Sequence, residues 1–163
     1  MSRPTYGIAI VTKERTDLLR ECLRFLRQSI NGGPRPPIFV WDNSEGEEVA
    51  AVCREHGVKR LHRNGENVSF AEANNLLAAE FKGDVLLVND DVFVAPGCID
   101  AMLAARREGV DLVGAKLLYL DSRIQHYGIG FSWEMHPFHI GRFEPHDGEW
   151  GSANRVVPAA TAA

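Results

Sequence analysis

The sequence DVLLVNDDVFV, at residues 84–94, places four consecutive apolar residues directly before Asn89, Asp90 and Asp91. A short run rich in valine, without polar alternation, predicts a strand that is covered on both faces, as in parallel sheets. Such a strand ends at the carboxyl edge of the sheet, where open α/β sheets bind ligands. Two adjacent carboxylates there favour a nearby cation, and Mg²⁺ or Mn²⁺ holding phosphate oxygens would satisfy them. A solvated Asn-Asp-Asp turn is the alternative, because both residue types favour turns.

The segments on either side of this stretch alternate between strand and helix patterns. A helix is expected to start at Thr16 or Asp17, either of which can cap it, and Gly57 is expected to end another. This alternation implies βαβ units and a mostly parallel sheet, and hence an α/β fold. The length of 163 residues suits a single domain. The expected strands are 6–11, 38–41, 58–62, 84–94 and 110–118, and the later helices are 45–56, 70–81 and 96–109.

Polar residues follow three of these strands at the point where each strand ends. The residues expected to gather at one edge of the sheet are Asp42, Asn43, Asp90, Asp91, Thr12 and Glu14. Together they predict a polar crevice suited to a nucleotide. The first strand is followed by neither a Gly-x-Gly-x-x-Gly motif nor a Walker loop, which argues against a dinucleotide dehydrogenase or a P-loop enzyme.

The composition of the chain limits the possible classes of protein and the possible cellular locations. The 18 basic and 22 acidic side chains give a formal charge of −4, which argues against a general nucleic-acid binder. No apolar run reaches the length of a membrane span, and the amino terminus lacks a signal-peptide core. The three scattered cysteines favour a reducing cytoplasm. The expected location is therefore the cytoplasm, or the inner face of a membrane.

The last third of the chain differs from the rest in its residue composition and in its shorter predicted strands. Residues 117–120 and 123–131 predict a hairpin that turns at Asp121 and Ser122. Four of the six histidines then lie between His126 and His146, among tryptophan, glycine and proline residues. Histidine and tryptophan on irregular backbone could line a polar ligand site, or the aromatic residues could simply pack a long loop onto the core. No His or Cys spacing indicates a zinc site.

Four segments, in this order, resemble motifs of the family 2 glycosyltransferases, which have the GT-A fold with a Rossmann-like core. They are VTKER (11–15), WDNS (41–44), NVSFAEANN (67–75) and NDD (89–91). Lys13 and Glu14 stand where the family commonly has tyrosine and asparagine, and Ser69 stands where glycine is usual. DSRIQHYG (121–128) resembles a hairpin of rhamnosyltransferase-like members, and residues 157–163 resemble the start of the next strand.

The resemblance implies metal-dependent, inverting transfer of a hexosyl or rhamnosyl group from a nucleotide-diphosphate sugar. The acceptor hydroxyl, on a glycan, a lipid-linked molecule or another compound, is not identified. Asp91 is expected to bind Mn²⁺ or Mg²⁺ directly, with Asp90 as a further ligand or facing the ribose. The resemblance places the following residues at the donor: Thr12, Glu14, Arg15, Asp42, Asn43, Asn67, Phe70, Asn74, Asn89 and Asp90.

The same resemblance places the catalytic base in an acidic motif beyond Ala163, with His126 and His139 as candidates within the chain. We therefore expect residues 1–163 to be one GT-A nucleotide-sugar-binding domain, truncated at its carboxyl end. Such a chain would bind donor but transfer sugar poorly, and a strand near residues 156–163 could favour a homo-oligomer. A non-catalytic nucleotide-sugar-binding module is the alternative. A nucleotidyltransferase is disfavoured because its Gly-rich phosphate loop is absent.

Overall fold

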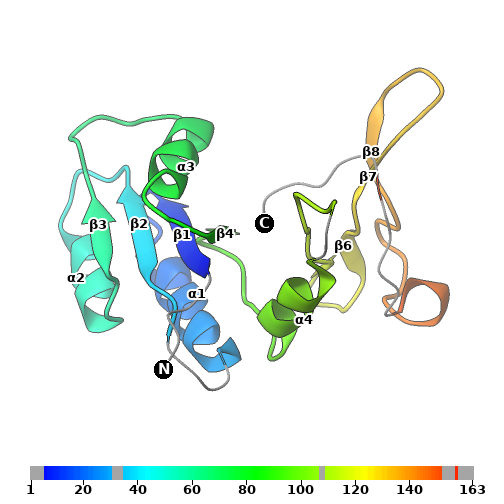
Figure 1. The fold of residues 1–163 in the computed structure, drawn as a ribbon, viewed down its shortest axis with the longest axis horizontal. Helices are drawn as coiled ribbons and strands as arrows, with labels where there is room; N and C mark the ends of the chain where they lie inside the picture. The colour runs from blue at the N-terminus through cyan, green and yellow to red at the C-terminus, as the bar shows by residue number, and fades with distance from the viewer. Residues whose placement is uncertain (1–5, 31–34, 107–108, 152–156, 158–163) are drawn as a thin grey trace. The chain divides into compact units, whose positions relative to one another are not determined.

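The computed structural model describes residues 6–30, 35–106, 109–151 and 157. The chain divides into two compact units, residues 1–99 and residues 100–163, and Figure 1 shows the elements of each. The expectation of one domain across the whole chain stays a prediction. In the described part of the chain, no helix is both long enough and apolar enough to cross a membrane.

The amino-terminal unit contains a four-stranded parallel sheet, as the alternating pattern predicted. Its order is β3-β2-β1-β4. The chain therefore adds two strands on one side of β1 and then places β4 on the other side, so the strand order reverses between β1 and β4. The strands are β1 (Tyr6–Thr12), β2 (Ile38–Asp42), β3 (Arg60–His62) and β4 (Asp84–Asn89).

Three helices accompany the sheet, namely α1 (Thr16–Ser29), α2 (Glu48–Glu55) and α3 (Phe70–Ala78). Ala73 and Leu77 of α3 pack in one core cluster with alternate residues of β1 and β2, which are Ala9, Phe39 and Trp41. Because strand side chains alternate between faces, the intervening apolar residues of β1 and β2 face the other way. Ile8, Ile10, Ile38 and Val40 are fully buried there. Helices α1 and α2 contact each other, and each contributes buried apolar residues, such as Leu23 of α1 and Val52 of α2.

The expected end of the strand at the Asn89-Asp90-Asp91 segment is confirmed, whereas the prediction that this strand is covered on both faces is wrong. The strand ends at Asn89, and a turn follows in which the Val92 amide donates to the Asn89 carbonyl at 3.3 Å. Among the described strands β4 also lies at an edge, so Val85 and Leu87 are only partly buried. The strands covered on both faces are β1 and β2.

The helix ends agree only in part with the sequence signals. The residue before α1 is Arg15, and neither Thr16 nor Asp17 caps the helix; no side-chain capping bond forms there. Gly57 follows α2 with a φ of 61°, a conformation that suits glycine, as expected. Helix α2 begins at Glu48 rather than at Glu45.

The carboxyl-terminal unit is built mainly from short strands. The predicted hairpin is confirmed, because Leu117 pairs antiparallel with His126 and the chain turns through Asp121 and Ser122. The strand predicted at 110–118 is wrong except for its last two residues, since the preceding residues pair with no described strand. The elements are α4 (Cys98–Ala105), which begins at the boundary, β5 (Leu117–Leu118), β6 (Ile124–His126), β7 (Ile129–Phe131), β8 (Pro137–His139) and a 3₁₀ turn, η1 (Gly148–Trp150). Apart from Val157, the strand expected at 156–163 lies outside the described residues.

Candidate nucleotide-sugar site

The carboxyl ends of β1 and β4 bring two of the predicted residues together. Val11 is in register with Asn89, so the residues that follow, Thr12 and Asp90, lie side by side. The Thr12 hydroxyl donates a hydrogen bond of 2.6 Å to Asp90 Oδ2, and both residues are buried. This is the place where the strand order reverses, which is where open α/β sheets form their ligand crevices.

The cation expected beside the two carboxylates is Arg15 in this structure. Its guanidinium lies 3.5 Å from Asp90 Oδ1 and 3.2 Å from Asp91 Oδ2. Burial raises the pKa of Asp90, although the Thr12 hydroxyl and Arg15 partly oppose this effect. The side chain of Asp91 is 41% exposed, whereas that of Asp90 is 8% exposed. Asp91 is therefore the carboxylate that an incoming ligand can reach.

The oxygen donors at this edge fit a hard divalent cation whose remaining ligands are oxygens of a bound phosphate. Asn89 Oδ1 is buried and has no hydrogen-bond partner among the residues that the structure describes, and it belongs to the residue directly before the two aspartates. Carboxylate and amide oxygens are ligands that Mg²⁺ and Mn²⁺ accept. The described residues contain no cluster of three or more His, Cys, Asp or Glu side chains that could hold a metal alone. Phosphate oxygens would have to complete the coordination.

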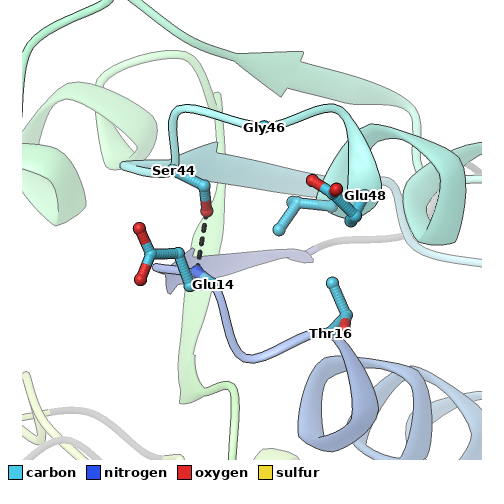
Figure 2. Close-up of a pocket in the computed structure, with 6 residues that line it drawn as sticks. Glu14, Thr16, Ser44, Gly46 and Glu48 are labelled. Atoms are coloured by element: carbon cyan, nitrogen blue, oxygen red, sulfur yellow. Dashed lines mark hydrogen bonds between the residues drawn. The ribbon is translucent and has the colours of Figure 1, made fainter.

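A pocket of about 200 Å³ lies beyond the ends of β1 and β2. Figure 2 shows the loop after β1 and the loop after β2 facing each other across it. The Glu14 amide donates to Ser44 Oγ at 2.7 Å, and Glu14 has a φ of 59°, which costs energy for a residue other than glycine. The lining residues are Glu14, Thr16, Ser44, Gly46, Glu48 and Val49.

Asp42 ends β2, two residues before the pocket-lining Ser44, and it contacts protein groups on both sides of its carboxylate. Its Oδ1 accepts the Ser44 amide at 2.8 Å, and its Oδ2 lies 3.0 Å from Nε of Arg63. The Asp42 side chain has no exposed surface. Asp42 thus orders the loop after β2. Its Oδ2 makes no hydrogen bond within the described residues, but the side chain is not exposed to a ligand in this arrangement.

Arg63 is the residue at this site that sequence reasoning missed. Besides Asp42, its guanidinium contacts Glu47 Oε1 at 2.6 Å and the carbonyl oxygens of residues 44, 45 and 46. It therefore holds the whole loop after β2 in place. One signal was available, because a carboxylate at the end of a buried strand requires a cationic or hydrogen-bonding partner.

Two predicted donor residues, Asn43 and Asn74, are engaged within the fold. Asn43 bridges both backbone groups of Val68, accepting the amide at 3.1 Å and donating to the carbonyl at 3.0 Å. Asn74 is buried and donates to the Phe70 carbonyl at 2.9 Å. Asn43 thus fixes the segment that leads into α3, where Asn67 and Phe70 are exposed.

Ser69, which stands where the family usually has glycine, is accommodated without strain. Its φ is −63° and its ψ is 153°, an extended conformation open to any residue, and its hydroxyl accepts the Glu72 amide at 3.2 Å. Ser69 therefore caps α3, as serine commonly does at this position.

The candidate bases His126 and His139 form a pair within the carboxyl-terminal unit. Their Nδ1 atoms lie 2.8 Å apart, and their rings meet edge to face. Because one nitrogen must donate and the other accept, this contact requires at least one Nδ1 to be deprotonated. His126 is 2% exposed, whereas His139 is exposed. Burial, together with His139, lowers the pKa of His126.

This pair is expected to make the carboxyl-terminal unit less stable in acid. The pKa of His126 is lower in the folded state than in the unfolded state. Its contribution to stability is therefore complete above about pH 6.5 and is lost as the pH falls below that value. Urea unfolding followed by Trp fluorescence at about pH 7.5 and about pH 5 tests this. His139→Asn should reduce the pH dependence, whereas His146→Asn, an exposed control, should not. Equal pH dependence in all three proteins would contradict the assignment.

A parallel sheet with helices packed on it, and with polar side chains gathered at the carboxyl edge where the strand order reverses, is an α/β fold of the kind that binds ligands at this edge. The sequence model described as Glycosyl transferase family 2 matches residues 7–150, so the chain belongs to that family. The fold is accordingly the GT-A type, as the sequence motifs implied.

Two curated relatives match most of the chain. An uncharacterized protein, y4gI of Sinorhizobium fredii, is 44% identical over 133 residues, which is 77% of this chain and 15% of that protein. The O-antigen biosynthesis protein RfbC of Myxococcus xanthus is 30% identical over 145 residues, which is 83% of this chain and 11% of that protein. The chain therefore spans only a small part of the length of either relative.

Two solved structures share the fold at low sequence identity. The mannosyltransferase PcManGT of Pyrobaculum calidifontis, in complex with GDP-Man and Mn²⁺, has a TM-score of 0.54 and 16% identity, over 63% of this chain and 32% of that one. TarS of S. aureus has a TM-score of 0.52 and 15% identity, over 62% of this chain and 19% of that one.

Proposed function

We propose that this chain binds a nucleotide-diphosphate sugar together with Mn²⁺ or Mg²⁺ and takes part in inverting transfer of the sugar to an acceptor hydroxyl. The observation that carries the proposal is the pair Asp90 and Asp91 at the strand-order reversal, held by Thr12 and Arg15. Family membership supports glycosyl transfer as the reaction, and the mannosyltransferase that shares the fold was solved with GDP-Man and Mn²⁺.

The donor is proposed to lie along the carboxyl edge of the sheet. Neighbouring strands lie about 4.8 Å apart, so the ends of β2 and β4, with β1 between them, are separated by roughly 10 Å. An extended nucleoside diphosphate covers such a span. We place its nucleoside in the pocket beyond β1 and β2, with Asn67 and Phe70 toward that end, and its diphosphate beside Asp90 and Asp91. Asp42, Asn43 and Asn74 would serve the site by holding the loops around it.

Asp91 is the proposed direct ligand of the metal, with Asp90 and Asn89 as the neighbouring oxygen donors. A bound divalent cation would stabilise the negative charge of the departing diphosphate. Arg15, now paired with both carboxylates, would become free to face a diphosphate oxygen when a cation takes its place.

The acceptor hydroxyl needs a general base. The family resemblance places this base in an acidic motif beyond Ala163, and His126 and His139 stay the candidates within the chain. The relative named for O-antigen biosynthesis supports a glycan as the acceptor.

A thermal-shift panel with UDP-, GDP-, dTDP- and CMP-sugars, each with and without Mn²⁺, tests the proposal. Diphosphate sugars should stabilise the chain only when metal is present, and the CMP-sugar, which has one phosphate, should not. Stabilisation without detectable sugar transfer would favour a nucleotide-sugar-binding module. Absence of any shift with every diphosphate sugar would contradict the proposed function.

A further inference from the structure

Arg15 faces the carboxylate oxygens that remain for a metal ion at the strand-order reversal. Asp90 Oδ2 accepts the Thr12 hydroxyl at 2.6 Å, so Oδ1 is the oxygen left for a further partner, and it lies 3.5 Å from Nη1 of Arg15. The same nitrogen lies 3.2 Å from Asp91 Oδ2. A divalent cation and a guanidinium repel each other, so they cannot both approach these oxygens closely. Metal binding therefore requires Arg15 to move.

The side chain of Arg15 can move without disturbing the fold. It is 48% exposed, and within the described part of the chain it contacts only these two aspartates. Its backbone is held separately, because the Arg15 carbonyl accepts the Leu19 amide at 2.9 Å at the start of α1. Ion pairs as exposed as these contribute little to stability. Arg15 is thus held beside the carboxylates by charge and not by packing.

The charges at this edge indicate when Arg15 would move. Two ionised carboxylates and one guanidinium leave the empty site with one net negative charge. A divalent cation by itself would make the site positive, and Arg15 would lose both of its partners. A nucleotide-diphosphate sugar brings a negative charge on each of its two phosphates, which restores the negative balance and gives the guanidinium a new anionic partner.

We infer that Arg15 makes metal binding depend on the donor, an inference that rests on the proposed function. Arg15 keeps Mn²⁺ or Mg²⁺ away from the empty carboxylates, and it moves to the diphosphate when metal and donor bind together. Coupling between two ligands is reciprocal, so the diphosphate raises the affinity for metal by the same factor as metal raises the affinity for the diphosphate.

Titration of Mn²⁺ into the nucleotide-free chain tests the exclusion of metal, with the free ion counted by its electron paramagnetic resonance signal. Arg15→Gln removes the competing cation and should bind Mn²⁺ about 10-fold more tightly than the parent, a factor typical of coupling between sites. Arg15→Lys keeps the positive charge and should stay closer to the parent. Arg20→Gln removes another arginine of α1, one that pairs with Asp17 and Glu55, and as the matched control it should leave the Mn²⁺ affinity unchanged.

Calorimetry with GDP and with UDP, at a Mn²⁺ concentration that saturates both proteins, tests the move of Arg15 to the diphosphate. Two nucleotides are used so that the result does not depend on one base. Arg15→Gln should bind both about 10-fold more weakly than the parent, because it has lost a charged contact to a phosphate. The two effects of this one substitution have opposite signs, which neither misfolding nor a general loss of support would produce.

The outcomes separate this inference from the proposal on which it rests. Failure of both nucleotides to bind the parent with Mn²⁺ would overturn the proposed function and the inference together. If the parent binds them, but Arg15→Gln binds Mn²⁺ alone no more tightly than the parent, the exclusion of metal by Arg15 is wrong and the proposed function stands. An equal gain in Arg20→Gln would also overturn it, since net charge would then explain the effect. Unchanged nucleotide affinity in Arg15→Gln would overturn the move to the diphosphate.

Discussion

Replacing Asp91 by asparagine is expected to abolish most of the metal-dependent affinity for a nucleoside diphosphate while leaving the fold intact. The Asp91 side chain is 41% exposed and its partner is Arg15, so the sheet does not depend on its charge. Changing a group that merely orients a metal ligand commonly costs 10- to 100-fold in metal affinity. Loss of a proposed direct ligand should therefore cost at least about 100-fold, measurable by calorimetry with GDP and Mn²⁺.

The matched control is Asp121→Asn, which neutralises an exposed aspartate of the carboxyl-terminal unit. It should bind nucleotide as the parent does. The thermal midpoint of Asp91→Asn without ligand should also equal that of the parent, which separates a loss of binding from a loss of folding. Equal Mn²⁺-dependent affinity in Asp91→Asn and the parent would contradict the proposed role of Asp91 as a metal ligand.

The sequence predicted the edge of the sheet well because the buried strands carry a strong signal. Continuous apolar runs at 6–11 and 38–41 favour strands covered on both faces, and parallel pairing brings their ends together. The register then aligns Thr12 with Asp42 on one side and sets it beside Asp90 on the other. The gathering of polar residues at this edge thus followed from strand type and direction alone.

The partners of those polar residues could not be predicted in the same way. Periodicity does not reveal that Arg63, twenty-one residues after Asp42, returns to pair with it, because a loop separates the two in sequence. Nor does it reveal that the Asn43 amide is used by the backbone of Val68. The error at 110–118 has a related cause, since an apolar run becomes a strand only where another strand is available to pair with it.

Arg63→Met is expected to lower the free energy of unfolding by about 3 kcal/mol, the lower end for breaking a buried ion pair, because the Arg63 side chain is 25% exposed. The variant leaves the buried Asp42 carboxylate without its cation, and the carbonyls of residues 44 to 46 lose a shared donor. Loosening this loop should also weaken nucleotide binding, since Ser44 and Gly46 line the pocket. Urea unfolding of the parent and the variant measures the stability change.

A second substitution distinguishes the buried charge from a simple loss of packing. Asp42→Asn removes the charge but keeps an oxygen for the Ser44 amide, so the double variant should regain at least about 1 kcal/mol relative to Arg63→Met alone. Arg60→Met, which breaks an ion pair between Glu80 and an arginine that is 59% exposed, should change stability by no more than about 1 kcal/mol. If Arg63→Met costs no more than Arg60→Met, the pairing of Arg63 with Asp42 does not stabilise the loop, and another interaction must hold the pocket in shape.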